Sequence, residues 1–209
     1  MPAHEINHDK TPIRLFKSDF LEFFTHISPV TIVVMWVPVI AYLLWSTVTR
    51  LGSSSPWLIP AGIFIGLFLW TLAEYTLHRF VFHFKPRNAF QERLSFLFHG
   101  VHHYQPQAKT RLVMPLPLSI PLAGLFFLLF WLVAGRLIGA PLWVGPLFAG
   151  FLIGYLVYDL IHYATHHFSM RRGYWKYIKR YHMAHHYKNP DGIFGVSSPI
   201  WDYVFKTTV

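Results

Sequence analysis

Eleven of the fourteen histidines in this 209-residue sequence fall in four short motifs. The motifs are His78-x4-His83, His99-x2-His102-His103, His162-x3-His166-His167 and His182-x2-His185-His186. Neutral imidazole is the commonest protein ligand for zinc, copper, iron and nickel. Ten imidazoles exceed what one ion can bind, so the motifs predict two metal ions held close together. The candidate ligands are His78, His83, His99, His102, His103, His162, His166, His182, His185 and His186.

The spacing within the motifs suits helices, because positions i, i+3 and i+4 share one face. On this basis two motifs each present three imidazoles together, and His162 and His166 form an i, i+4 pair. His78 and His83 would be about 140° apart on an ideal helix. Either the helix bends or ends there, or the two bind different metals. His167 breaks the face of its motif, which favours a structural or supporting role.

Two acidic residues lie close to these motifs, in apolar surroundings where a charge is costly and by default functional. Glu74 precedes His78 by one helical turn, and Asp159 precedes His162 by three residues. Both are well placed to accept a histidine N–H and to offset metal charge, as residues behind metal ligands commonly do. The alternative is that they cap a helix or pair with an arginine such as Arg79.

Plainer interpretations of the histidines exist. A single buried histidine is usually a hydrogen-bonded core residue, and a cluster at a membrane end can also relay protons or lie at the interface. The three histidines outside the motifs are expected to be solvated or interfacial: His4, His8 and His26.

The composition indicates an integral membrane protein. Apolar residues make up 54% of the chain and charged residues only 13%, about half of what a soluble surface needs. The absence of cysteine excludes disulfides, zinc–thiolate sites, iron–sulfur clusters and a cysteine nucleophile. In so apolar a chain, the net charge of +9 is better explained by membrane topology and anionic lipid headgroups than by nucleic acid.

Four apolar stretches approach the roughly 20 residues that a membrane-spanning helix needs. The short turns at 50–56 and 135–140 predict two helical hairpins. Sixteen of the eighteen Lys and Arg residues lie on the side of the histidines, which the positive-inside rule makes cytoplasmic together with both termini. We therefore predict an all-α membrane protein with a cytosolic tail (1–26) and a four-helix domain (27–209). Its cytosolic helical cap, formed by 78–115 and 162–209, holds the metal site. The stretches are Ile27–Val48, Trp57–Leu77, Leu116–Ala134 and Pro141–Ile161.

A histidine-rich dinuclear site with few carboxylates favours redox-active iron, although zinc fits the same ligands. At a membrane boundary it suits O2-dependent attack on a C–H bond of a lipid. The electrons must come from an external donor, because the sequence contains no flavin, haem or nicotinamide motif.

The strings EYTLHRFVFHF (74–84), FHGVHHYQP (98–106), YDLIHYATHH (158–167) and YHMAHHYKNPDGIFGVSSPIWDYVF (181–205) resemble the fatty acid hydroxylase superfamily. They are most similar to fatty acid 2-hydroxylases that act on sphingolipid acyl chains. The resemblance spans about 57–206 and implies four membrane helices under a cytosolic cap, and hydroxylation next to the acyl carbonyl at a dimetal site. The family's ligands fall on the ten histidines named above. Weaker site candidates are Tyr187, Asp191, Ser197 and Trp201.

Two departures from this family bear on function. His167 stands where a non-ligand, commonly aromatic, residue is expected. The haem-binding N-terminal domain of eukaryotic members is absent from the sequence, which implies a separate electron-transfer partner. The alternatives are a sterol or carotenoid hydroxylase or desaturase of the same superfamily, a membrane metal transporter, and a structural protein with a dead site. A bacterial membrane and the endoplasmic reticulum remain open, as does the oligomeric state.

Overall fold

The computed structural model describes residues 6–52 and 55–208, and the regular secondary structure within these ranges is entirely helical. The predicted all-α class is confirmed. The α-helices are α1 (Asp19–Phe23), α2 (Pro29–Leu51), α3 (Leu58–Leu77), α4 (Ala89–Ser95), α5 (Val101–Tyr104), α6 (Leu116–Phe130), α7 (Pro141–His167), α8 (Gly173–Tyr187) and α9 (Ile200–Phe205). Three π-helical segments (His78–Phe82, Phe96–Gly100 and Trp131–Leu137) and one 3-10 turn (Lys109–Arg111) join or extend them.

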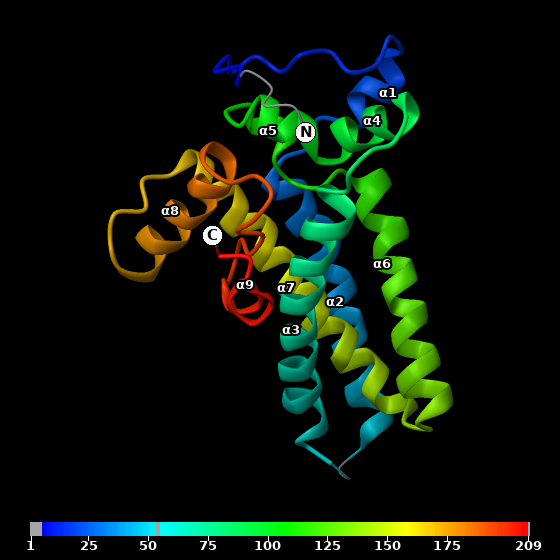
Figure 1. The fold of residues 1–209 in the computed structure, drawn as a ribbon. Coiled ribbons are helices and arrows are strands. Elements are labelled where there is room, and N and C mark those ends of the chain that lie inside the picture. The colour runs from blue at the N-terminus through cyan, green and yellow to red at the C-terminus, as the bar shows by residue number, and fades with distance from the viewer. Residues whose placement is uncertain (1–5, 53–54, 209) are drawn as a thin grey trace. The chain divides into compact units, whose positions relative to one another are not determined.

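Four helical stretches are long and apolar enough to cross a membrane, as predicted (Figure 1). The chain is a multi-pass membrane protein. The third stretch is longer than predicted at both ends and runs from Lys109 to Leu137. The second and fourth are longer at their C-terminal ends, since the second continues to Phe82 and the fourth to His167. These helices therefore run directly into the first and third histidine motifs. The stretches are Pro29–Leu51, Leu58–Phe82, Lys109–Leu137 and Pro141–His167.

Residues 29–72 and 116–157 form one compact unit, the bundle of the four long helices. Burial is uneven among them. In α7, 83% of the most apolar window is buried, whereas the stretch that contains α6 has only 6% of its window buried. The surface of α6 is thus almost entirely available to lipid, and α7 is the helix around which the bundle packs.

Glycine allows α3 and α7 to approach until their backbones touch. A Cβ atom added at Gly66 would lie 2.0 Å from the Leu147 carbonyl oxygen, and one added at Gly150 would lie 2.2 Å from the Ile63 carbonyl oxygen. Small residues promote helix association in membranes for this reason, because close backbones maximise van der Waals contact. The Trp70 ring also packs edge-on against the rings of α7, so this helix pair is closely fitted.

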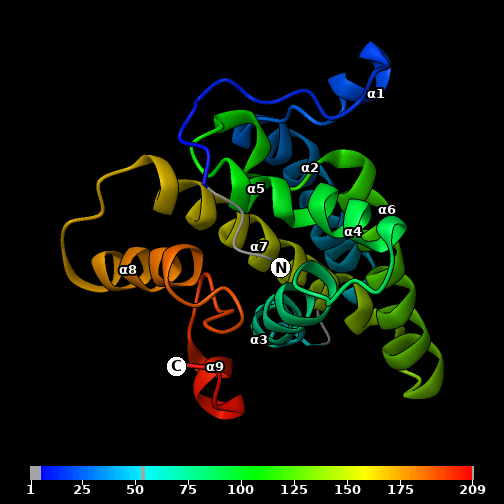
Figure 2. The same ribbon diagram turned by 45° about the horizontal axis from the view of Figure 1, so that its top comes forward.

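The remaining residues, 1–28, 73–115 and 158–209, are assigned to a second compact unit. It contains the ends of α3 and α7 that carry histidine motifs, together with the short helices α1, α4, α5, α8 and α9. Figure 2 shows α5 and α8 beside the end of α7. The helix α8 turns Ile178 and its three histidines inward, whereas its basic and aromatic residues are mostly exposed.

Within this unit, residues 7–26 pack along residues 104–111. We call residues 7–26 the N-terminal strap. The buried side chain of Gln105 accepts a hydrogen bond from Ile13 N (2.8 Å) and donates one to Thr11 O (3.1 Å). Arg111 donates to Ile13 O at 2.7 Å and forms an ion pair with Glu22. The strap therefore holds the segment that follows the second histidine motif.

Candidate metal centre

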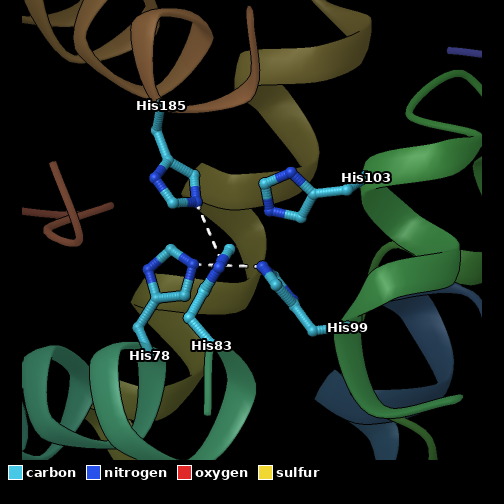
Figure 3. Close-up of side chains that lie close together, drawn as sticks. All are labelled: His78, His83, His99, His103 and His185. Carbon is cyan, nitrogen blue, oxygen red and sulfur yellow. Dashed lines mark hydrogen bonds between the residues drawn. The ribbon is translucent and has the colours of Figure 1, made fainter. Parts of the chain in front are cut away.

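The ten candidate ligands come together in two groups of five, all within the second compact unit. Within each group the ligand nitrogen atoms lie within 4.8 Å of one another. Figure 3 shows the first group, whose rings converge on a common centre. The first group consists of His78, His83, His99, His103 and His185, and the second of His102, His162, His166, His182 and His186.

The π-helical turn His78–Phe82 brings the two histidines of the first motif together. His83 N donates to His78 O at 3.0 Å, a bond between residues five apart. A π-turn holds more residues than an α-turn, so positions i and i+5 fall on one side. The ring centroids of His78 and His83 are 4.9 Å apart. Both residues therefore lie in the first group rather than in different ones.

The three histidines of the second motif divide between the groups. His99 and His103, an i, i+4 pair, join the first group, while His102 joins the second. The reason is local, because neighbouring residues on a helix point in different directions. The fourth motif divides in the same way and sends only His185 to the first group.

The two groups adjoin. The rings of His103 and His186, which belong to different groups, stack with their centroids 4.1 Å apart and an interplanar angle of 20°. Two ions held by such groups would be close neighbours, as the number of histidines predicts.

Burial keeps these imidazoles neutral at physiological pH. Burial and the neighbouring His185 lower the pKa of His83 to about 2. Burial also lowers the pKa of His185 to about 4, although the Gly192 carbonyl acts in the opposite direction. A metal ligand must be deprotonated, so these nitrogens present lone pairs without first losing a proton. Burial likewise holds the pKa values of other members of both groups well below the usual range: His99, His102, His103, His182 and His186.

The residues fit a pair of metal ions. The Nε2 atoms of His166 and His182 are 2.8 Å apart, and those of His83 and His185 are 3.0 Å apart. The buried Nε2 atom of His103 has no hydrogen-bond partner among the described residues. A bound cation would accept the lone pairs of nitrogen atoms that converge in this way. Imidazole suits zinc, copper, iron and nickel.

The two acidic candidates bind backbone N–H groups. The Glu74 side chain accepts hydrogen bonds from Val196 N (2.8 Å) and Ser197 N (2.7 Å). Asp159 accepts from Met114 N, with its nearer oxygen 3.3 Å away. Both carboxylates are buried. It stays a prediction that the two residues support the metal-binding histidines. The contacts of Glu74 indicate that it would do so indirectly, by fixing the backbone at Val196 and Ser197.

His167 lies in neither group, and its ring packs against Tyr163 with the centroids 4.6 Å apart. Of the weaker candidates, Asp191 lies in neither group, and Ser197 donates to Glu74 through its N–H and hydroxyl groups. The Tyr187 ring lies 6.2 Å from that of His186, and Trp201 stacks on Phe205. Of the three remaining histidines, His26 contacts Thr110 at 2.8 Å, whereas His4 lies outside the described residues.

Sequence reasoning overlooked one residue near the site. Asp202 on α9 has no exposed surface and accepts hydrogen bonds from Phe194 N and Gly195 N. The carbonyl of Phe194 in turn lies 2.5 Å from His78 Nδ1. In the sequence, Asp202 could have been recognised as the only charged residue in the apolar run 199–205.

The fold and the site together define a class of protein: a multi-pass helical membrane protein with two adjoining groups of five imidazoles. Residues 63–207 match the sequence model of the family described as fatty acid hydroxylase. The chain belongs to this family, as its motifs predict.

Its relatives include the dihydroceramide fatty acyl 2-hydroxylase FAH1 of Arabidopsis thaliana, to which it is 38% identical over 93% of this chain and 79% of the relative. It is also 38% identical to the fatty acid 2-hydroxylase of Rattus norvegicus, over 95% of this chain but only 57% of the relative. A solved structure of full-length scs7p, in which only the hydroxylase domain is visible, has a TM-score of 0.80 and 37% identity. That match covers 91% of this chain and 70% of the other.

Proposed function

We propose that this chain is an O2-dependent hydroxylase that inserts a hydroxyl group at the 2-position of a fatty acyl chain, either as a free acid or within a sphingolipid. The observation that carries the proposal is the pair of five-histidine groups, because it supplies two adjoining metal positions in a chain that has four membrane-spanning stretches. The names of the relatives support the substrate class, since they include acyl 2-hydroxylases of ceramides and fatty acids.

We propose iron as the working metal, with zinc as an ion that the same ligands retain in a purified sample. When bound, two iron ions would supply the activation of O2 that an unreactive C–H bond requires. In the overall reaction one oxygen atom enters the C–H bond and the other leaves as water. Two electrons and two protons complete the balance, and we assign the electrons to a separate electron-transfer protein.

The chain's own residues would perform three tasks. The histidines offer neutral nitrogen atoms in two fixed groups, so the ligands need little rearrangement when a metal binds. Their burial removes water from the surroundings of the reacting carbon. The apolar helices would keep the chain in the lipid bilayer, where an acyl substrate is also found.

We further propose that the histidine groups and both termini face the cytoplasm. The support is the distribution of Lys and Arg, of which only Arg50 and Arg136 lie at the ends of membrane stretches opposite the histidine motifs. Cysteines introduced singly at Ser18 and at Ser55, an exposed residue between the first two membrane stretches, would test it by labelling with an impermeant reagent in sealed vesicles. Labelling of the first only from the cytoplasmic side supports the proposal.

The activity is tested by lipid mass spectrometry of cells with and without the chain, grown under isotopically labelled O2. The proposal expects acyl chains that gain one labelled oxygen at the 2-position, and His83→Ala and His166→Ala variants that make none. Acyl chains that lose two hydrogens would indicate a desaturase, and labelled sterols or carotenoids another substrate class. A change in metal flux without any product would indicate a transporter. Fewer than one equivalent of metal would indicate a dead site.

A further inference from the structure

The loop 192–198 contacts two histidines of the first group from behind. The carbonyl oxygen of Gly192 lies 2.7 Å from His185 Nδ1, and that of Phe194 lies 2.5 Å from His78 Nδ1. Carbonyl oxygens only accept hydrogen bonds, so each Nδ1 carries the proton. This tautomer leaves the Nε2 lone pair of each ring directed away from the loop, as a metal ligand requires.

Two buried carboxylates hold this loop in place through four consecutive backbone N–H groups. Asp202 accepts from Phe194 N at 2.8 Å and from Gly195 N at 2.7 Å. Glu74 accepts from the next two N–H groups and from the Ser197 hydroxyl. The backbone N–H groups of the loop therefore bind the two carboxylates, and two of its carbonyl oxygens accept hydrogen bonds from candidate metal ligands.

The loop contains a strained residue that depends on these contacts. Ile193 has φ = 61°, a left-handed conformation that β-branched residues avoid. Such a conformation persists only where the surroundings over-determine it. Here Ile193 N donates to Thr207 O at 2.7 Å, and the Thr207 hydroxyl donates to Asp202 at 2.6 Å. Asp202 thus holds the loop on both sides of Ile193.

The second group is supported differently. Four of its members have a buried Nδ1 atom that lacks a hydrogen-bond partner among the described residues: His102, His162, His182 and His186. No carbonyl oxygen of the loop 192–198 accepts a hydrogen bond from these four nitrogen atoms. Its orienting effect therefore falls on one group.

We propose that Asp202 is a positioning residue for the first histidine group and that this group consequently retains its metal more tightly than the second. Asp202 fixes the loop, the loop carbonyls fix the tautomer and orientation of His78 and His185, and the pre-organised ligands release metal slowly. The inference rests on the metal centre of the proposed function but not on hydroxylation itself.

The test measures metal release from the full-length chain in lipid nanodiscs, loaded with Zn²⁺ and then exposed to an excess of chelator. The wild-type chain is expected to release two ions in two phases. His83→Ala should abolish the slow phase and His166→Ala the fast phase, which assigns each phase to a group. Asp202→Asn is expected to accelerate the slow phase by about 10- to 100-fold, the range typical of residues that orient metal ligands, and to leave the fast phase unchanged.

The matched control is Asp19→Asn, the same chemical change at an exposed residue that pairs with Arg14 in the N-terminal strap, away from the loop, which should alter neither phase. Glu74→Gln loosens the same loop from its other side and should accelerate the same slow phase, which keeps the test valid if Asp202→Asn fails to fold. Acceleration of both phases equally, or of neither, overturns the inference. If the slow phase responds as expected but no hydroxylated lipid is found, the proposed function fails while the positioning role stands.

Discussion

The Nε2 atoms of His102 and His162 lie 2.9 Å apart, although 60 residues separate them along the chain. The neighbour of His102, His103, lies in the other group. Two adjacent residues of one short helix thus serve different groups of ligands. Because His102 and His103 belong to different groups, replacing each of them tests whether the two groups bind separate metal ions.

We expect His102→Ala and His103→Ala each to reduce the bound metal from two equivalents to about one. The pair His102→Ala/His166→Ala should still retain about one equivalent, because both changes fall in the second group. The pair His102→Ala/His103→Ala should retain almost none. Elemental analysis of the purified variants measures these values. Equal losses in the two double variants would contradict the division into two groups.

The ion pair between Arg111 and Glu22 should stabilise the N-terminal strap. Glu22→Ala leaves the buried Arg111 side chain without its counter-charge, and breaking a buried pair costs about 3 kcal/mol. Replacing both residues, in Glu22→Ala/Arg111→Met, should cost clearly less than the sum of the single changes Glu22→Ala and Arg111→Met. Unfolding by a denaturing detergent, followed by circular dichroism, gives the four values of this cycle. Strictly additive values would show that the pair is not coupled.

The strap should also loosen in acid. Burial raises the pKa of Glu22, but N–H groups of Phe16 and Leu15 and the charge of Arg111 outweigh it, so the pKa is lowered overall. A lowered pKa means that the ionised carboxylate stabilises the fold above the unfolded pKa of about 4.3. That stability is lost as the pH falls through the folded value. Hydrogen exchange at Leu15 and Phe16, corrected for its intrinsic pH dependence, should accelerate below about pH 4. Glu22→Gln should remove this step.

The contact between α3 and α7 should tolerate no side chain at Gly150. A Cβ there would meet the Ile63 backbone at 2.2 Å, so Gly150→Val must push the helices apart, which costs about 3 kcal/mol. Gly124 on α6 has nothing within 4 Å of its added Cβ, and Gly124→Val is the matched control. Thermal unfolding in nanodiscs should separate the two variants clearly. Similar losses in both would mean that the glycine acts only through helix propensity.

Much of this architecture could be predicted from local patterns. Apolar length identified the four membrane stretches, and the i, i+4 spacing correctly paired His162 with His166 on α7. These features depend on one helix at a time. Residues within a helix have fixed directions, so their sequence spacing is enough.

The division of ligands required the tertiary structure. His102 and His103 differ by one position, and only their tertiary contacts, with His162 on α7 and with His83 after α3 respectively, decide which group each joins. The π-turn at His78 has no distinctive local sequence, because its geometry reflects the contacts that its histidines make. Asp202 was overlooked for the same reason, since it acts on a loop that precedes it rather than on a neighbouring histidine.

The interleaving of ligands also dictates an order of events during biosynthesis. The first group needs His185, and the second needs His182 and His186, so each draws its last members from the fourth motif, close to the C-terminus. Neither group is complete until translation has passed α8, by which time all four membrane stretches have been made. Metal loading must therefore follow the synthesis of all four membrane stretches, and a chain truncated before His182 would be inserted with both metal sites incomplete.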